Sequence, residues 1–137
     1  MSLAAENGQP KIYMMTLHTA QFDRMKDFFN RTMEMDVIFE NGEFAEFSSQ
    51  GLRLSLVSHS SLSSFLKADG LSGKRVGSGV GIGFEYETVE AVDEAYARLI
   101  ERGAVAVAAP EAQDWGEYTA FFADPDGNVH ELVTPLK

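Results

Sequence analysis

A glutamate inside an apolar segment near the end of the chain is the most informative candidate for chemistry. Glu131 lies in the run 128–134, and in an extended strand its side chain shares one face with Val129 and Val133. A carboxylate in such a half-buried strand raises the free energy of the fold unless it meets a metal ion, a base or water. Glu131 is therefore a candidate metal ligand, or the anion that meets a cationic ligand.

The residues just before this strand predict a tight turn. Pro125 presets φ for a turn, while Gly127 and Asn128 tolerate a positive φ. Asp124 and Asp126 have side chains that accept hydrogen bonds from nearby backbone N–H groups. The segment 118–134 therefore predicts a closing hairpin that carries Glu131 on its second strand.

Three further side chains could contribute to a binding site. Arg53 shares a strand face with Ser55, so it either lies near Glu131 or is solvated at the strand end. Trp115 and Tyr118 lie at the entrance to the closing hairpin and could stack on a flat ligand, or pack at a subunit contact. The sequence leaves both pairs of alternatives open.

The elements that position these residues occur twice in the same order. Asn41-Gly42 predicts a hairpin in the first half. In the second half Thr88 is a plausible helix N-cap, and Gly103 supplies the stop. The chain is therefore predicted to be α+β, with two βαβββ modules. The predicted strands are 11–17, 36–40, 43–48 and 52–58, then 80–87, 104–108, 118–123 and 128–134, with helices from Phe22 to Met33 and from Thr88 to Gly103.

The predicted organisation is one domain behind a loose tail. Residues 1–10 form the tail, and residues 11–137 form the domain. Module 1 spans about 11–58 and module 2 about 80–135, and a Ser/Gly-rich linker of about 59–79 joins them. Within the linker, the segment 60–68 could hold one or two helical turns.

Composition excludes several classes of function. The formal net charge of −10 repels phosphate backbones and anionic membranes, so neither nucleic acid nor membrane is expected as a partner. The absence of cysteine excludes disulfides, thiolate metal ligands and a cysteine nucleophile. No secretory leader, P-loop or dinucleotide-binding glycine motif is evident, and a cytoplasmic location is expected.

The chain resembles the glyoxalase, bleomycin-resistance and extradiol-dioxygenase superfamily, which has the vicinal oxygen chelate fold. The resemblance lies in the order of elements from residue 11 to 135 and in the turn 124–128 ahead of Glu131. The resemblance implies curved mixed sheets around a cavity, with metal ligands on the first and fourth strand of each module. By strand position these places look like Met14, Ser55, Gly81 and Glu131. Only Glu131 is a competent ligand for a hard or borderline divalent metal. We therefore expect no metal and no cofactor.

Histidine supplies the one alternative metal site. Thr16 and His18 share the face of Met14, so they are included among the expected ligand-binding residues. A trio of His18, His59 and Glu131 would require a rearranged centre, because the histidines do not occupy the expected strand-centre positions.

The resemblance and the missing ligands predict a metal-free, small-molecule-binding homodimer. It would be of the bleomycin-resistance type and would sequester a hydrophobic or cationic ligand in a cup-shaped cavity. The alternatives are a metal-dependent glyoxalase, lyase or dioxygenase with a rearranged site, and a structural or regulatory module with an occluded cup.

Overall fold

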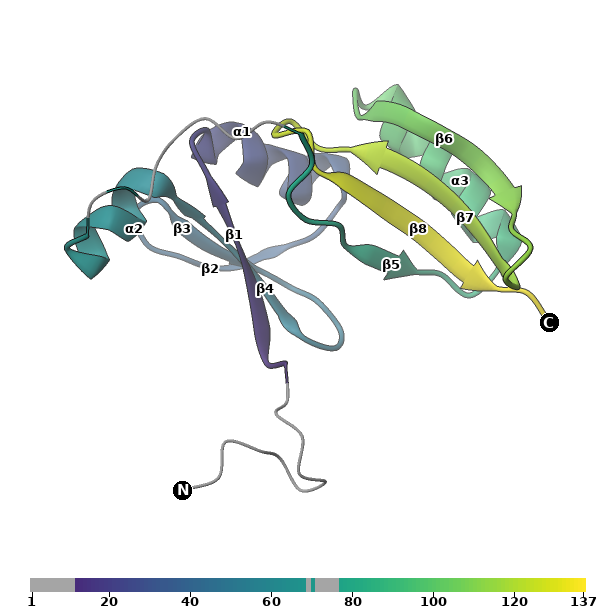
Figure 1. The fold of residues 1–137 in the computed structure, drawn as a ribbon, viewed down its shortest axis with the longest axis horizontal. Coiled ribbons are helices and arrows are strands. Elements are labelled where there is room, and N and C mark those ends of the chain that lie inside the picture. Colours follow the sequence, from purple (N-terminus) through teal and green to yellow (C-terminus); the bar gives the residue numbers. More distant parts are fainter. Residues whose placement is uncertain (1–11, 69, 71–76) are drawn as a thin grey trace, which may run out of the picture. The chain divides into compact units, whose positions relative to one another are not determined.

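The computed structural model describes residues 12–68, 70 and 77–137 (Figure 1). These residues form two compact units. The first unit takes its described residues from 1–22 and 35–72, and the second takes them from 23–34 and 73–137. The predicted tail 1–10 and linker residues 71–76 lie outside the described part of the chain. None of the described helices is long and apolar enough to cross a membrane.

The first unit contains a four-stranded mixed sheet. Its strands are β1 (Met14–Thr19), β2 (Val37–Glu40), β3 (Phe44–Phe47) and β4 (Arg53–Ser58), in the spatial order β1-β4-β3-β2. β1 and β4 are parallel, and the other neighbours are antiparallel. The predicted turn at Asn41-Gly42 joins β2 to β3, and Gly42 has a φ of +58°. The short helix α2 (His59–Leu66) follows β4, which accounts for the helical turns predicted inside the linker.

The second unit repeats this topology. Its strands are β5 (Gly83–Glu85), β6 (Val105–Ala112), β7 (Glu117–Ala123) and β8 (Val129–Pro135), in the order β5-β8-β7-β6. β5 is shorter than the predicted strand 80–87, and β6 extends beyond the predicted 104–108. The α+β class and the two curved four-stranded mixed sheets are therefore confirmed.

Helix α3 (Val89–Glu101) lies along one face of the second sheet (Figure 1). The hydroxyl of Thr88 accepts a hydrogen bond from the N–H of Ala91 at 3.0 Å, so the predicted N-cap is confirmed. Gly103 follows the helix with a φ of +99°, a conformation that favours glycine at a helix end. Val92 and Leu99 are buried on the inner side of the helix.

The helix predicted from Phe22 forms as two segments, and most of it belongs to the second unit. α1 (Phe22–Asp27) continues into the π-helical turn η1 (Phe28–Thr32), which is closed by the Met33 N–H on the Phe28 carbonyl at 2.9 Å. The ring centroid of Phe28 lies 6.2 Å from that of Phe122. Phe28 and Phe29, consecutive residues of this turn, are both buried.

The two faces of the second sheet differ in what covers them. On the helix-covered face, Phe122, His130 and Leu132 are fully buried. On the other face, Phe121, Glu131 and Val133 are only partly buried. Because successive strand residues alternate between faces, this pattern places Glu131 on the open face and His130 on the covered one.

Candidate functional site

The carboxylate of Glu131 occupies the middle of β8, beside a position without a side chain. Gly83 of β5 pairs with Glu131 on one side, and Phe121 of β7 pairs with it on the other. A Cβ atom at Gly83 would lie 3.7 Å from the Glu131 Oε1, so the glycine leaves the carboxylate accessible from β5. In the described part of the chain, the carboxylate has no hydrogen-bond partner. Burial raises the pKa of Glu131, and the nearby Glu117 carboxylate adds to the increase.

The strand register shows which residues pair with Ser55 and with Glu131. Ser55 of β4 pairs with Thr16 of β1, whereas Met14 pairs with Arg53. Gly83 pairs with Glu131, so it holds the equivalent position in the second sheet. The four matching strand positions are therefore Thr16 and Ser55 in the first sheet and Gly83 and Glu131 in the second, with Met14 and Gly81 two residues earlier in the chain.

Gly81 has a different role from the one expected of a ligand position. It precedes β5, and a Cβ atom there would lie 2.9 Å from the backbone oxygen of Val129. Real Cβ atoms essentially never approach a backbone oxygen so closely. Glycine at position 81 therefore allows the close approach of this segment to the start of β8.

Neither sheet offers, at these strand positions, a donor set that fits a divalent metal. Thr16 and Ser55 hydrogen-bond to each other through their hydroxyls at 2.8 Å, and Ser55 is fully buried. Gly83 has no side chain, which leaves Glu131 as the single charged donor. Protein sites for divalent metals normally combine three or more carboxylate, imidazole or thiolate ligands. Among the described residues, no group of three His, Asp or Glu side chains is arranged to hold a metal.

Arg53 is held by two side chains of the first unit. Its Nε and Nη2 atoms donate to the carboxylate of Glu46, at 2.8 and 2.5 Å, and its Nη1 donates to the Tyr13 hydroxyl at 2.6 Å. The guanidinium carbon also lies 5.1 Å from the centroid of the Tyr13 ring. The hydrogen bonds from Arg53 lower the pKa of Glu46, and the same contacts raise the pKa of Arg53.

Neither Glu46 nor Tyr13 was singled out in the sequence. Glu46 lies opposite Ser55 across β3 and β4, and this register places it diagonally beside Arg53. The alternation of side chains along β3 could have indicated the shared face, once the pairing of β3 with β4 was known.

Trp115 and Tyr118 do not form one stacking surface in the second unit. Tyr118 lies on the helix-covered face, and its hydroxyl donates to the Asp93 carboxylate of α3 at 2.7 Å. This hydrogen bond raises the pKa of Tyr118. Trp115 is 61% exposed, and its indole N–H donates to Glu117 at 2.9 Å. Of the two aromatic side chains, Trp115 is the one linked to the Glu131 face, through Glu117.

The three histidines occupy three different environments. His18 is exposed on β1, on the same strand face as Thr16. His59 begins α2. His130 is fully buried beneath the rings of Phe29 and other aromatic side chains, on the face of β8 opposite Glu131.

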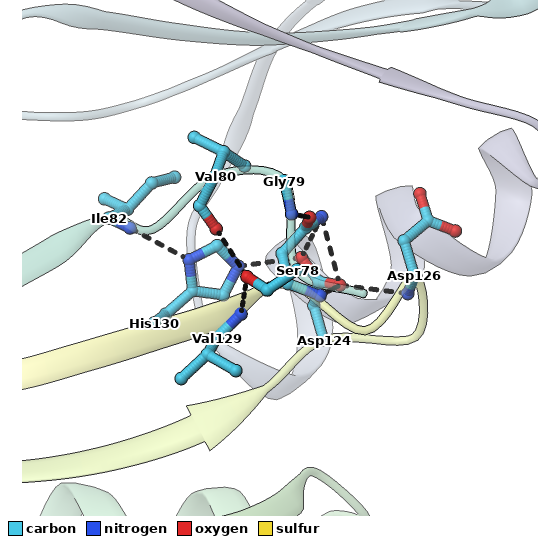
Figure 2. Close-up of polar contacts among 9 residues, drawn as sticks. Ser78, Gly79, Val80, Ile82, Asp124, Asp126, Val129 and His130 are labelled. Carbon is cyan, nitrogen blue, oxygen red and sulfur yellow. Dashed lines mark hydrogen bonds and ion pairs between the residues drawn. The ribbon is translucent and has the colours of Figure 1, made fainter. Parts of the chain in front are cut away.

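A buried polar network lies directly behind Glu131, and the sequence reasoning missed it. The Nε2 of His130 lies 2.7 Å from an oxygen of Asp124 (Figure 2). Asp124 also accepts from the backbone N–H groups of Asp126 and Asn128, at 2.9 and 3.0 Å. Burial alone would raise the pKa of Asp124, but the hydrogen bonds from His130 and Asn128 lower it below its ordinary value. The motif 124–128 is therefore an anchored turn, and the predicted backbone bonding by Asp124 is confirmed.

Comparison with protein families gives one match over most of the chain. Residues 11–132 match the family described as the Glyoxalase/Bleomycin resistance protein/Dioxygenase superfamily. No curated protein matches the chain significantly.

Solved structures show the same fold at low sequence identity. A glyoxalase/bleomycin resistance protein/dioxygenase from Nocardioides superposes with a TM-score of 0.82 at 22% identity, covering 94% of this chain and 85% of the other. A glyoxalase/bleomycin resistance protein/dioxygenase family enzyme from Burkholderia phytofirmans PsJN gives 0.80 at 20% identity, covering 91% and 98%. A lactoylglutathione lyase from Agrobacterium tumefaciens gives 0.70 at 20% identity, covering 90% and 92%.

Proposed function

The chain belongs to the Glyoxalase/Bleomycin resistance protein/Dioxygenase superfamily, and we propose that it is a metal-free small-molecule-binding protein of the bleomycin-resistance type. In this proposal it sequesters a hydrophobic or cationic ligand, and Glu131 supplies the anionic contact. Fold likeness alone does not choose between the activities found in a superfamily, so the proposal rests on the side chains of this chain.

The observation that carries the proposal is the contrast among the four matching strand positions. Thr16 and Ser55 satisfy each other's hydroxyl groups, and Gly83 offers no donor. Glu131 remains as a lone, partly desolvated carboxylate without a hydrogen-bond partner in the described part of the chain. Such a group binds a cation favourably, because the ligand's charge offsets the unfavourable desolvation of the carboxylate.

The absence of a bound metal is tested by elemental analysis of protein purified without chelator. We expect no stoichiometric transition metal, because hydroxyls and a glycine stand at three of the four positions. About one Ni, Zn, Fe or Mn per chain would contradict the proposal. It would favour the metal-dependent alternative, with His18 or His59 as the first candidates for additional ligands.

Ligand charge is tested with two probes of the same shape, phenyltrimethylammonium and its uncharged carbon isostere tert-butylbenzene. We expect the cation to bind the wild-type protein more tightly, because only the cation makes a charge-assisted contact with Glu131. The Glu131→Gln variant should bind the cation roughly ten- to hundredfold more weakly, the effect of losing one desolvated charged contact.

The matched control is Glu101→Gln, which makes the same change in net charge at an exposed position on α3. Equal cation affinities in the two variants would mean that the protein's overall negative charge attracts the probe. Binding of neither probe would favour a structural module with an occluded cup.

We also propose that the protein is a homodimer. The outer strands β2 and β6 expose apolar side chains, with Ile38 at 59%, Phe39 at 53% and Val105 at 60%. Unpaired strand edges with apolar side chains favour association with another sheet. Sedimentation equilibrium at micromolar concentration should give twice the chain mass of 15.1 kDa. A single species at the chain mass would contradict the dimer.

A further inference from the structure

The imidazole of His130 connects the turn 124–128 to the segment that leads into β5. Its Nδ1 accepts a hydrogen bond from the Ile82 N–H at 3.1 Å (Figure 2). Because Nδ1 is the acceptor, the ring proton is on Nε2, which donates to Asp124 at 2.7 Å. Both ring nitrogens are therefore satisfied inside the fold, and each bond requires this one tautomer.

Both backbone polar groups of Ile82 form hydrogen bonds with neighbouring residues of β8. Its N–H donates to the side chain of His130, and its carbonyl accepts from the Glu131 N–H at 2.9 Å. The next residue, Gly83, is the one that pairs with Glu131. The bond from His130 therefore lies one residue away from the glycine that keeps the Glu131 carboxylate accessible.

A second set of contacts holds the same segment a few residues earlier. The Asn128 side-chain oxygen accepts from the Gly79 N–H at 3.1 Å, and the Ser78 hydroxyl accepts from the Val129 N–H at 3.0 Å. Asp124 in turn fixes Asn128, whose side-chain nitrogen lies 3.1 Å from a carboxylate oxygen. Figure 2 shows Ser78, Gly79 and Ile82 arranged around this network.

The network is completely buried and completely satisfied. Asp124, Asn128 and His130 are at most 2% exposed, and no buried polar side-chain atom among the described residues lacks a partner. Buried polar groups in this state favour a single geometry, because any displacement leaves a donor or acceptor unpaired. A slip of β5 along β8 would break the bonds to Gly79 and Ile82.

We propose that Asp124, Asn128 and His130 are positioning residues of the ligand site, which set the register of β5 against β8 and thereby hold Gly83 beside Glu131. The link to ligand binding rests on the proposed function of Glu131. The positioning itself depends only on contacts within the second unit, so it is tested without any ligand.

Two amide substitutions test the two hydrogen bonds of the imidazole one at a time. His130→Asn places an amide oxygen near the position of Nδ1, so it retains an acceptor for Ile82. His130→Gln places its amide near Nε2, so it retains a donor for Asp124 and loses the acceptor for Ile82. Both variants remove the ring, so each serves as a packing control for the other.

The first measurement is amide hydrogen exchange by NMR. In His130→Gln we expect the N–H groups of Ile82 and Glu131 to exchange roughly ten- to hundredfold faster, beyond any change in the core amides of α3. His130→Asn should show a much smaller local increase. Thr88→Ala removes the N-cap of α3 in the same unit, and it should accelerate exchange without singling out Ile82 or Glu131.

The second measurement is the pKa of Glu131, followed through its carboxyl carbon signal. The pKa should stay raised in His130→Asn and Thr88→Ala, and it should shift in His130→Gln, because a displaced β5 changes the surroundings that desolvate the carboxylate. A network that only stabilised the fold would leave this pKa unchanged in every folded variant.

Equal local exchange in the two His130 variants, or a Glu131 pKa that is unaffected by His130→Gln, would overturn the proposal. If either variant fails to fold, Asn128→Ala tests the same positioning through Gly79, with local exchange at Gly79 as the expected result. A failure of cation binding would contradict the proposed function and leave these two readouts unaffected, so the two failures are distinguishable.

Discussion

Replacing Asp124 by alanine should be among the most destabilising single substitutions in the second unit. The carboxylate is 2% exposed and accepts hydrogen bonds from the backbone N–H groups of Asp126 and Asn128, from the Asn128 amide and from His130. Alanine removes all of these acceptors. The His130 Nε2–H and the Asn128 N–H then lose their carboxylate acceptor at positions that water does not reach, because both residues are at most 1% exposed.

The expected loss follows from these two donors. A buried donor left without an acceptor costs about 1–3 kcal/mol, so Asp124→Ala should lower the free energy of unfolding by about 2–6 kcal/mol. Small domains have a total stability of about 5–15 kcal/mol, so the effect is large. Asp124→Asn retains volume and one acceptor oxygen, and its loss should be smaller.

The substitution should also change how stability depends on pH. The folded-state pKa of Asp124 is lowered, so the ionised carboxylate contributes stability above the unfolded value of about 3.9. That contribution is lost as pH falls through the folded pKa. Asp124→Asn has no such ionisation, so its stability should decrease less than that of the wild type between neutral and strongly acidic pH.

Urea unfolding followed by circular dichroism, repeated from neutral to acidic pH, measures both effects. Asp114→Ala makes the same chemical change at an exposed position, and it should alter stability by no more than about 0.5 kcal/mol. The reasoning is refuted if Asp124→Ala costs less than about 1 kcal/mol. Parallel pH curves for the wild type and Asp124→Asn would refute the electrostatic part.

Two further outcomes concern the other ionised side chains. Glu131→Gln should maintain or raise the melting temperature at neutral pH. The folded-state pKa of Glu131 is raised, so the wild-type fold loses stability as pH rises through that pKa. Glutamine does not ionise and avoids this loss. A lower melting temperature of the variant would mean that the carboxylate has a stabilising partner. Arg53→Met should lower the melting temperature because Glu46 loses its partner, and adding Glu46→Leu should recover it. The control is Arg31→Met, which removes an exposed ion pair with Asp27 and should change the melting temperature little. Equal changes in melting temperature for the two single arginine variants would contradict the role of Arg53.

The sequence by itself determined the features that act over a few residues. The Thr88 cap, the Gly103 stop and the turn 124–128 depend on side chains that bond or bend the backbone within one turn of chain. The order of elements and this turn were also enough to identify the superfamily. Side-chain alternation correctly placed Glu131 and His130 on opposite faces of one strand, because that alternation depends on the strand alone.

The tertiary structure decided which residues meet across strands. Met14 and Thr16 lie on the same face of β1, so a shift of two residues leaves the hydrophobic pattern unchanged, and only the register shows that Thr16 pairs with Ser55. In the second sheet, likewise, only the register shows that Gly83 pairs with Glu131.

Which side chains bind one another also depends on how the strands pair. Arg53 pairs with Glu46, and His130 binds Ile82, 48 residues away in the chain. No local rule encodes these contacts, because each one forms only after separate strands have paired and packed. The candidate residue Glu131 was therefore readable from the sequence, whereas the network that positions Gly83 beside it was not.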